Sequence, residues 1–203
     1  MTAKRISIFP LAGAVLFPGM QLPLHIFEPR YRALVSDSLA RDRLIGMIQP
    51  RESGFHPALY DVGCLGRIGH VEALDDGRFR LTLQGVCRFR IVEEMEVSTM
   101  FRQVKAELFD EDEDEALAPV VRSALEQVSR EYADHMGYRI DWTAVAQLDD
   151  ATLVNAIAQI APFDVASKQA LLEASSLADR AEQAMQLMQF YTRTDKDNPG
   201  VLQ

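Results

Sequence analysis

The spacing of apolar residues changes abruptly about halfway along the chain, and this change constrains the fold more than any other feature. Up to residue 108, apolar side chains mostly recur at every second position, which is the period of a β-strand. After residue 115 they recur every three or four positions, which is the period of an α-helix. A run of strands followed by a run of helices predicts an α+β protein.

The clearest strand pattern lies in residues 78–91, where apolar side chains alternate with arginines. This alternation predicts that Arg78, Arg80, Arg88 and Arg90 point outward while the residues between them face a core. The other expected strands cover residues 6–9, 22–26, 44–48, 64–73 and 101–108. Many short strands separated by turn residues predict a sheet that curls into a barrel.

One helix is expected among the strands, over residues 29–41, because Pro29 suits the first turn of a helix. In the second half, a stripe from Leu117 to Met136 predicts a long helix that Gly137 ends. Two shorter helices are expected over residues 150–160 and 164–174, each opened by an Asp, and a last one from Ser176. Four such helices predict a small bundle, followed by a loose tail over residues 194–203.

Six successive carboxylates, residues 110–115, separate the two patterns. Like charges in such a block repel one another and cannot be buried together, so the block predicts a solvated joint. We therefore expect two domains, a β-barrel over residues 1–109 and a helical bundle over residues 110–203. A divalent-metal site is disfavoured, because the block lacks the spaced ligands and the Gly turn of a calcium loop.

The charge of the chain is distributed unevenly. Residues 1–108 carry 14 Lys/Arg and 12 Asp/Glu, whereas residues 109–203 carry 7 and 18. The acidic half would repel phosphates, which lowers the expectation of nucleic-acid binding. We expect a cytoplasmic protein with no membrane contact, since no apolar run is long enough to cross a bilayer and no signal core follows Met1. Cys64 and Cys87 are too few for a disulfide framework or a zinc site.

Three consecutive segments near the N-terminus carry a family resemblance: residues 8–11 (IFPL), 15–19 (VLFPG) and 22–31 (LPLHIFEPRY). Together they resemble the opening of the N-terminal domain of the Lon proteases. The similarity continues more weakly around residues 46–48, 62–68, 83–89, 162 and 168–173. The resemblance implies a PUA-like β-barrel followed by a small C-terminal α-helical bundle, and a role in recognising polypeptide substrates.

Candidate binding residues are taken from these segments: Phe17, Pro18, Pro23, Leu24, His25, Phe27, Glu28, Arg30 and Tyr31. The alternative is that they build the fold and touch no ligand. Each Pro fixes its own backbone and restricts the residue before it, so these prolines suit bends around a short strand. Glu28, Arg30 and Tyr31 would then dock the short helix onto the barrel.

Catalytic motifs are missing from the sequence, so no enzymatic activity is expected. A Lon protease needs a phosphate-binding loop, but no Lys in this sequence follows a Gly. The Ser-Lys pair of the protease is not matched either: Ser167 and Lys168 are adjacent on a predicted helix, and their side chains would point in different directions. No cofactor and no metal ion are expected.

These observations predict non-catalytic binding of unfolded or exposed polypeptide segments. One alternative is an adaptor or regulator that docks on a separate protease or chaperone. Another is RNA binding through the barrel, for which the arginines of residues 78–91 are the supporting pattern. The sequence leaves open the identity of the polypeptides, the position of the groove, the oligomeric state and any joint action with a full-length protease.

Overall fold

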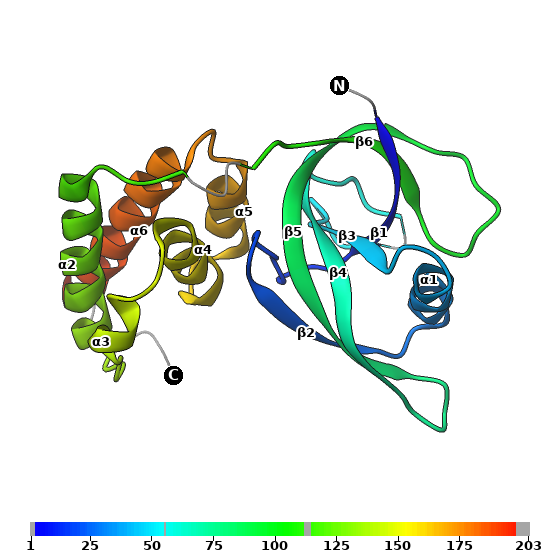
Figure 1. The fold of residues 1–203 in the computed structure, drawn as a ribbon, viewed down its shortest axis with the longest axis horizontal. Coiled ribbons are helices and arrows are strands. Elements are labelled where there is room, and N and C mark those ends of the chain that lie inside the picture. The colour runs from blue at the N-terminus through cyan, green and yellow to red at the C-terminus, as the bar shows by residue number, and fades with distance from the viewer. Residues whose placement is uncertain (1–2, 55, 112–114, 198–203) are drawn as a thin grey trace.

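The computed structural model describes residues 3–54, 56–111 and 115–197. It confirms the α+β class: Figure 1 shows the strands on one side of the molecule and most of the helices on the other. The described strands are β1 (Lys4–Pro10), β2 (Gln21–Ile26), β3 (Leu44–Ile48), β4 (Val62–Ala73), β5 (Phe79–Glu94) and β6 (Gln103–Leu108). Each contains most of a strand that the alternating pattern predicts.

Five of these strands close into a ring. β5 pairs with β4, β4 with β3, β3 with β1, β1 with β6, and β6 returns to β5. Only the β1–β3 pair is parallel among the described strands. One buried cluster draws its side chains from all five strands of the ring: Ile6, Ile8, Ile48, Leu65, Phe89, Val104 and Ala106.

β5 is long enough to belong to two parts of the sheet. Its first residues, from Phe79 to Gln84, pair with β2, and its last residues, from Phe89 to Glu94, pair with β6. A register shift in its pairing with β4 falls between these two parts, opposite Gly85 and Cys87, and an irregularity of this kind bends a strand. Among the described strands β2 pairs with β5 alone, so β2 forms an edge of the sheet.

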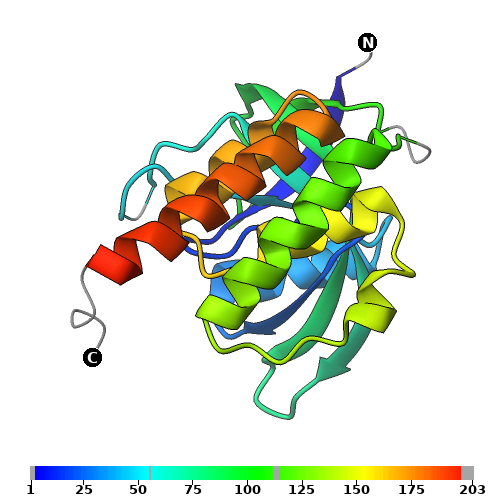
Figure 2. The ribbon, with the colours of Figure 1, turned by 90° about the vertical axis from the view of Figure 1, so that its left-hand side faces the viewer.

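The helices of the described part are α1 (Pro29–Leu39), α2 (Pro119–His135), α3 (Trp142–Val145), α4 (Asp150–Ile160), α5 (Val165–Glu173) and α6 (Leu177–Asp197). Figure 2 shows α2 and α6 side by side across the helical end of the molecule. The four predicted helices are confirmed, and α3 was not predicted.

Local sequence explains most helix boundaries. α1 begins at Pro29, as predicted. The side chain of Asp164 caps α5 by accepting a hydrogen bond from the Ser167 N–H, 2.9 Å away. Asp149 caps α4 in the same way, one residue before the Asp that the sequence suggested. α6 continues to Asp197, past the start of the predicted loose tail, and residues 198–203 lie outside the described residues.

The two halves of the chain share one large buried cluster. It contains Leu16 and Phe17 from the strand half together with Leu153 and Leu172 from the helical half. The strands end at Leu108 and α2 begins at Pro119, but the division into two domains stays a prediction. In the part of the chain that the structure describes, no helix has the length and apolar character needed to cross a membrane.

Candidate functional site

The nine candidate binding residues fall in three places. Phe17 and Pro18 lie where the strand half meets the helices. Pro23, Leu24, His25 and Phe27 lie along and just beyond the edge strand β2. Glu28, Arg30 and Tyr31 lie at the start of α1. The structure therefore separates a group that contacts the helices from two groups that border the surface.

Phe17 and Pro18 are held by side-chain amides of α4. The Phe17 N–H donates to Gln159 Oε1 at 3.1 Å, and Asn155 Nδ2 donates to the Pro18 carbonyl at 3.0 Å. The side chain of Phe17 is fully buried. Both residues therefore fasten the strand half to the helical half.

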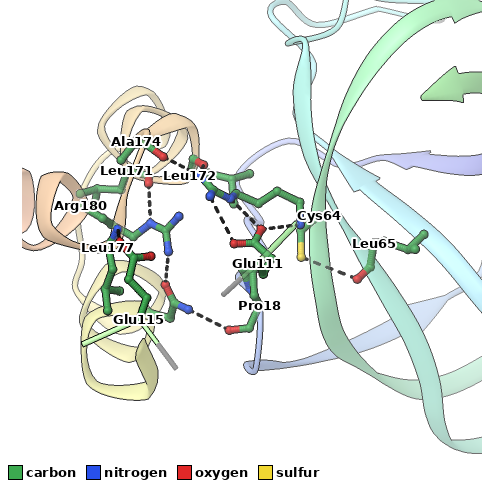
Figure 3. Close-up of polar contacts among 12 residues, drawn as sticks. Pro18, Cys64, Leu65, Glu111, Glu115, Leu171, Leu172, Ala174, Leu177 and Arg180 are labelled. Atoms are coloured by element: carbon green, nitrogen blue, oxygen red, sulfur yellow. Dashed lines mark hydrogen bonds and ion pairs between the residues drawn. The ribbon is translucent and has the colours of Figure 1, made fainter. Parts of the chain in front are cut away.

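A buried polar network continues this contact between the halves (Figure 3). Arg88 Nε donates to Glu111 Oε1 at 2.8 Å, and Arg88 Nη1 donates to the carbonyls of Leu172 and Ala174. Arg180 donates to Asn155 Oδ1 at 2.7 Å and to the Leu171 carbonyl at 2.9 Å. Figure 3 shows the network between the strands and the helices, with Glu111 at its centre.

The electrostatics of this network follow from burial and pairing. Burial raises the pKa of Glu111, but hydrogen bonds from Arg88 and the charges of Arg88 and Arg180 outweigh burial and lower that pKa below its usual value. Burial and the neighbouring charge of Arg88 lower the pKa of Arg180 to about 10. Both groups therefore remain charged at neutral pH and attract one another across the contact.

Two predictions about exposure are wrong at this contact. Arg88 does point away from the ring of strands, but helices cover it, and only 7% of its side chain is exposed. Glu111 belongs to the acidic block that was expected to be solvated, yet it is paired with Arg88. Glu115 is also bonded, to the N–H of Leu177 at 2.9 Å. Residues 112–114 of the block lie outside the described residues.

Three of the four arginines that suggested RNA binding are paired with carboxylates, and the fourth, Arg90, lies 5.5 Å from the centre of the Phe109 ring. Besides Arg88, Arg78 lies 2.6 Å from the carboxylate of Asp76, and Arg80 lies 3.7 Å from that of Glu72. Neighbouring carboxylates of this kind reduce the positive potential available to phosphates.

The second group of candidates is exposed. Pro23 and His25 are exposed on one face of β2, while Leu24 is partly buried on the other. Phe27 follows the strand and is 61% exposed, with its ring centroid 6.2 Å from that of His25. A large aromatic side chain at this exposure is available to a partner.

The third group borders a surface hollow. Tyr31 is buried, and its hydroxyl donates to the Pro10 carbonyl at 3.2 Å, which docks α1 onto β1 as predicted. Burial raises the pKa of this hydroxyl. The Arg30 guanidinium lies 4.4 Å from the centre of the Tyr31 ring and 2.9 Å from the Glu28 carboxylate. Glu28 thus orients Arg30 over Tyr31.

The hollow beside Arg30 and Tyr31 has a volume of about 240 Å³ and is rich in proline. Its lining includes Pro10, Ala12, Pro50, Pro57 and Arg102. Arg102 also lines a second hollow of about 410 Å³, with Met95, Val97, Met100, Phe101 and His56. Together the two hollows offer apolar side chains alongside charged ones, among them Glu52, Glu94 and Arg102.

Arg102 is fixed at the boundary between these hollows. It donates two hydrogen bonds to the carboxylate of Glu94, at 2.7 and 2.6 Å, and one to the Pro57 carbonyl at 2.8 Å. These contacts hold the pKa of Glu94 below its usual value, chiefly through the hydrogen bond from Arg102. Arg102 and Met100 were not predicted from the sequence. The hollow beside Tyr31 joins segments far apart in the chain, whereas the second hollow is lined by residues between 94 and 102 and by His56. Met100 is 65% exposed.

Ser167 and Lys168 lie on α5 and line neither of the two hollows. The adjacent Ser167 and Lys168 have separate partners: the Ser167 hydroxyl donates to Asp164, and Lys168 Nζ donates to the Gln159 carbonyl. Among the described residues, no group of three or more His, Cys, Asp or Glu side chains is placed to hold a metal ion. The arrangement offers contact surface and hydrogen bonds.

Comparison with known proteins identifies a family to which this chain is similar. The family model of the ATP-dependent protease La (LON) substrate-binding domain matches residues 5–189. A Lon protease 2 of Myxococcus xanthus is 26% identical over 192 residues, which cover 90% of this chain and 23% of the relative. A Lon protease 2 of Sorangium cellulosum is 31% identical over 135 residues, which cover 62% of this chain and 17% of the relative. This chain therefore spans less than a quarter of the length of these relatives.

Two solved structures share the fold. A crystal structure of a Lon N-terminal domain protein from Xanthomonas campestris is similar with a TM-score of 0.70 at 23% identity, over 90% of this chain and 98% of that one. The N-terminal domain of a Mycobacterium avium complex Lon protease gives a TM-score of 0.71 at 16% identity, over 92% and 98%.

Proposed function

This chain belongs to the Lon substrate-binding domain family, and from that membership we propose that it binds unfolded or exposed polypeptide segments without catalysing a reaction on them. The observation that carries this proposal is Phe27. It is exposed at the end of an edge strand, and the chain then leads directly into α1, whose Arg30 and Tyr31 border a hollow rich in proline.

The contact surface is assigned to two of the three groups of candidate residues. Pro23, Leu24, His25 and Phe27 offer apolar surface along β2, and the hollows beside Arg30, Tyr31 and Arg102 offer further apolar surface. Such a surface tolerates many side-chain sequences, because burial of apolar area is not directional. Phe17 and Pro18 are assigned to the fold.

Titration of a fluorescent unfolded polypeptide against the full chain tests this function. A reduced and carboxymethylated globular protein serves as the probe, and the same protein in its native, disulfide-bonded form serves as the control. We expect the anisotropy to rise with the unfolded probe only. Equal signals from the two forms up to high micromolar concentration would contradict the proposal.

The other predicted functions give different results in related experiments. An adaptor for a separate protease or chaperone would bind that folded partner, which a pull-down followed by mass spectrometry detects, and would ignore the unfolded probe. RNA binding would weaken steeply as salt is raised, because it depends on phosphate contacts. The pairing of Arg78, Arg80 and Arg88 with carboxylates disfavours it.

A further inference from the structure

The backbone groups of β2 divide into two sets. Because Gly85 N–H donates to the Met20 carbonyl, the pair formed by Met20 and Gly85 is hydrogen-bonded, and bonded pairs then alternate along the strand. Leu22 and Leu24 therefore bond to β5, whereas the backbone groups of Gln21, Pro23 and His25 point away from β5. Pro23 agrees with this assignment, since a residue without an N–H suits a position that makes no bond to β5.

The first outward group of β2 already has a partner that imitates a neighbouring strand. Gln159 Nε2 donates to the Gln21 carbonyl at 2.8 Å, while Gln159 Oε1 accepts from the Phe17 N–H at 3.1 Å. One side-chain amide thus both donates and accepts along this segment, as a backbone peptide group does. α4 holds this amide in place, since Asn155, one helical turn earlier, bonds to the Pro18 carbonyl.

Beyond Gln159 the outward groups are open. In the described part of the chain, nothing bonds to the Pro23 carbonyl or to the N–H and C=O of His25. Successive outward residues of a strand are roughly 6.8 Å apart. An extended polypeptide presents its own N–H and C=O groups at the same repeat, which makes it the natural occupant of such an edge.

We infer that an extended polypeptide segment adds to the sheet along the free edge of β2, beginning next to the Gln159 side chain and running toward Phe27. This inference rests on the proposed function and assigns it a mode of binding. Alternate side chains of the segment would pack beside the half-buried Leu22 and Leu24, and the others would lie beside the exposed Pro23 and His25. Segments with apolar residues at every second position are therefore preferred.

N-methylated peptides test the inference directly. A labelled peptide of about eight residues with alternating Val and Thr is compared with two derivatives, methylated on the backbone nitrogens of all Val or of all Thr residues. The N–H groups of the two sets lie on opposite edges of an extended peptide. We expect one derivative to lose binding at least tenfold and the other to retain it.

The outcomes separate the inference from the proposed function. If the unmethylated peptide and an unfolded protein probe both fail to bind, the proposed function is wrong. If the parent peptide binds and both derivatives bind equally well, polypeptide binding stands but strand addition is overturned.

Variants of the edge provide a second, independent measurement. His25→Pro removes an outward N–H, and His25→Thr removes the same imidazole but keeps that N–H. The ratio of their dissociation constants reports the N–H alone, and we expect His25→Pro to bind about threefold to tenfold more weakly. Pro23→Thr adds an outward N–H and is expected to bind more tightly. Strand addition at β2 is excluded if His25→Pro and His25→Thr bind the parent peptide equally well, if Pro23→Thr binds it as the original chain does, and if all three variants keep the far-UV circular dichroism of the original chain.

Discussion

Arg88 and Glu111 join β5 to the segment that leads into the helices, with 2.8 Å between Arg88 Nε and Glu111 Oε1. The backbone N–H of Arg88 donates to the same oxygen at 2.9 Å, and a second guanidinium nitrogen reaches the other carboxylate oxygen at 3.2 Å. Only 7% of the Arg88 side chain and 21% of the Glu111 side chain are exposed. The passage from strands to helices is therefore fastened by a mostly buried ion pair.

Removing the Glu111 carboxylate is expected to destabilise the protein strongly. Glu111→Ala leaves the buried guanidinium of Arg88 without its charged partner, which costs roughly 3 kcal/mol of unfolding free energy. The neighbouring Asp110 is exposed, so Asp110→Ala is the matched control, with a change within about 0.5 kcal/mol. Urea denaturation of both variants measures the difference, and equal stabilities would show that the ion pair contributes little.

The same carboxylate makes the stability depend on pH. The pKa of Glu111 is lower in the folded protein than its usual value. Its contribution is therefore complete above the usual glutamate pKa of about 4.3 and is lost as the pH falls through the lower folded-state value. We expect the difference in unfolding free energy between the original chain and Glu111→Gln to shrink below about pH 4. A difference that stays constant down to about pH 3 would contradict this assignment.

Gly85 is expected to tolerate no side chain. A Cβ at this position would overlap the carbonyl oxygen of Phe17, where the backbone of the 17–20 segment crosses β5. We predict that Gly85→Ala costs about 3 kcal/mol or more, because backbone atoms cannot move aside cheaply. Gly69 on β4 is the control, since a Cβ there would lie 3.4 Å from its nearest neighbour, an ordinary contact. Thermal unfolding followed by circular dichroism compares the two, and similar melting temperatures would refute the predicted close approach.

Phe27 is expected to matter for binding and not for folding. Because its side chain is 61% exposed, Phe27→Ser removes little buried surface and should leave the melting temperature nearly unchanged. Affinity for the unfolded probe should fall about threefold to tenfold, since the apolar area that the partner buries is lost. Val120→Ser on α2 is the control, as Val120 is 74% exposed in the helical half. An equal effect of the two substitutions would remove Phe27 from the contact surface.

Local patterns predicted the elements well because they depend on local physics. The alternation around Leu81 and Leu83 predicted β5, and Pro29 and Gly137 marked a helix start and a helix end that the structure confirms. Gly137 takes a φ of 71°, a conformation that suits glycine after a helix. These features need only neighbouring residues, which a single sequence displays.

Exposure and site geometry were harder to predict because they depend on distant segments. The alternation of apolar residues and arginines correctly predicted that Arg88 points away from the ring of strands. It could not predict that Leu172 and Ala174 cover Arg88, because those residues lie more than 80 positions further along the chain. The hollows are a similar case: Arg102 lies beside Tyr31 and Pro57 only after the strands have paired. Exposed candidates such as Phe27 were found through a resemblance, and the contact surface assigned to them stays a proposal.

The Gln159 amide and Pro23 together have a consequence for self-association. Two copies of a protein with an unpaired edge strand can pair through these strands and nucleate aggregates. In β2 the Gln21 carbonyl is already bonded to Gln159, and Pro23 has no backbone N–H. Two β2 edges placed side by side would therefore leave several of their backbone groups without hydrogen bonds. The molecule can thus keep a short stretch of backbone open to other chains while discouraging its own copies from polymerising through it.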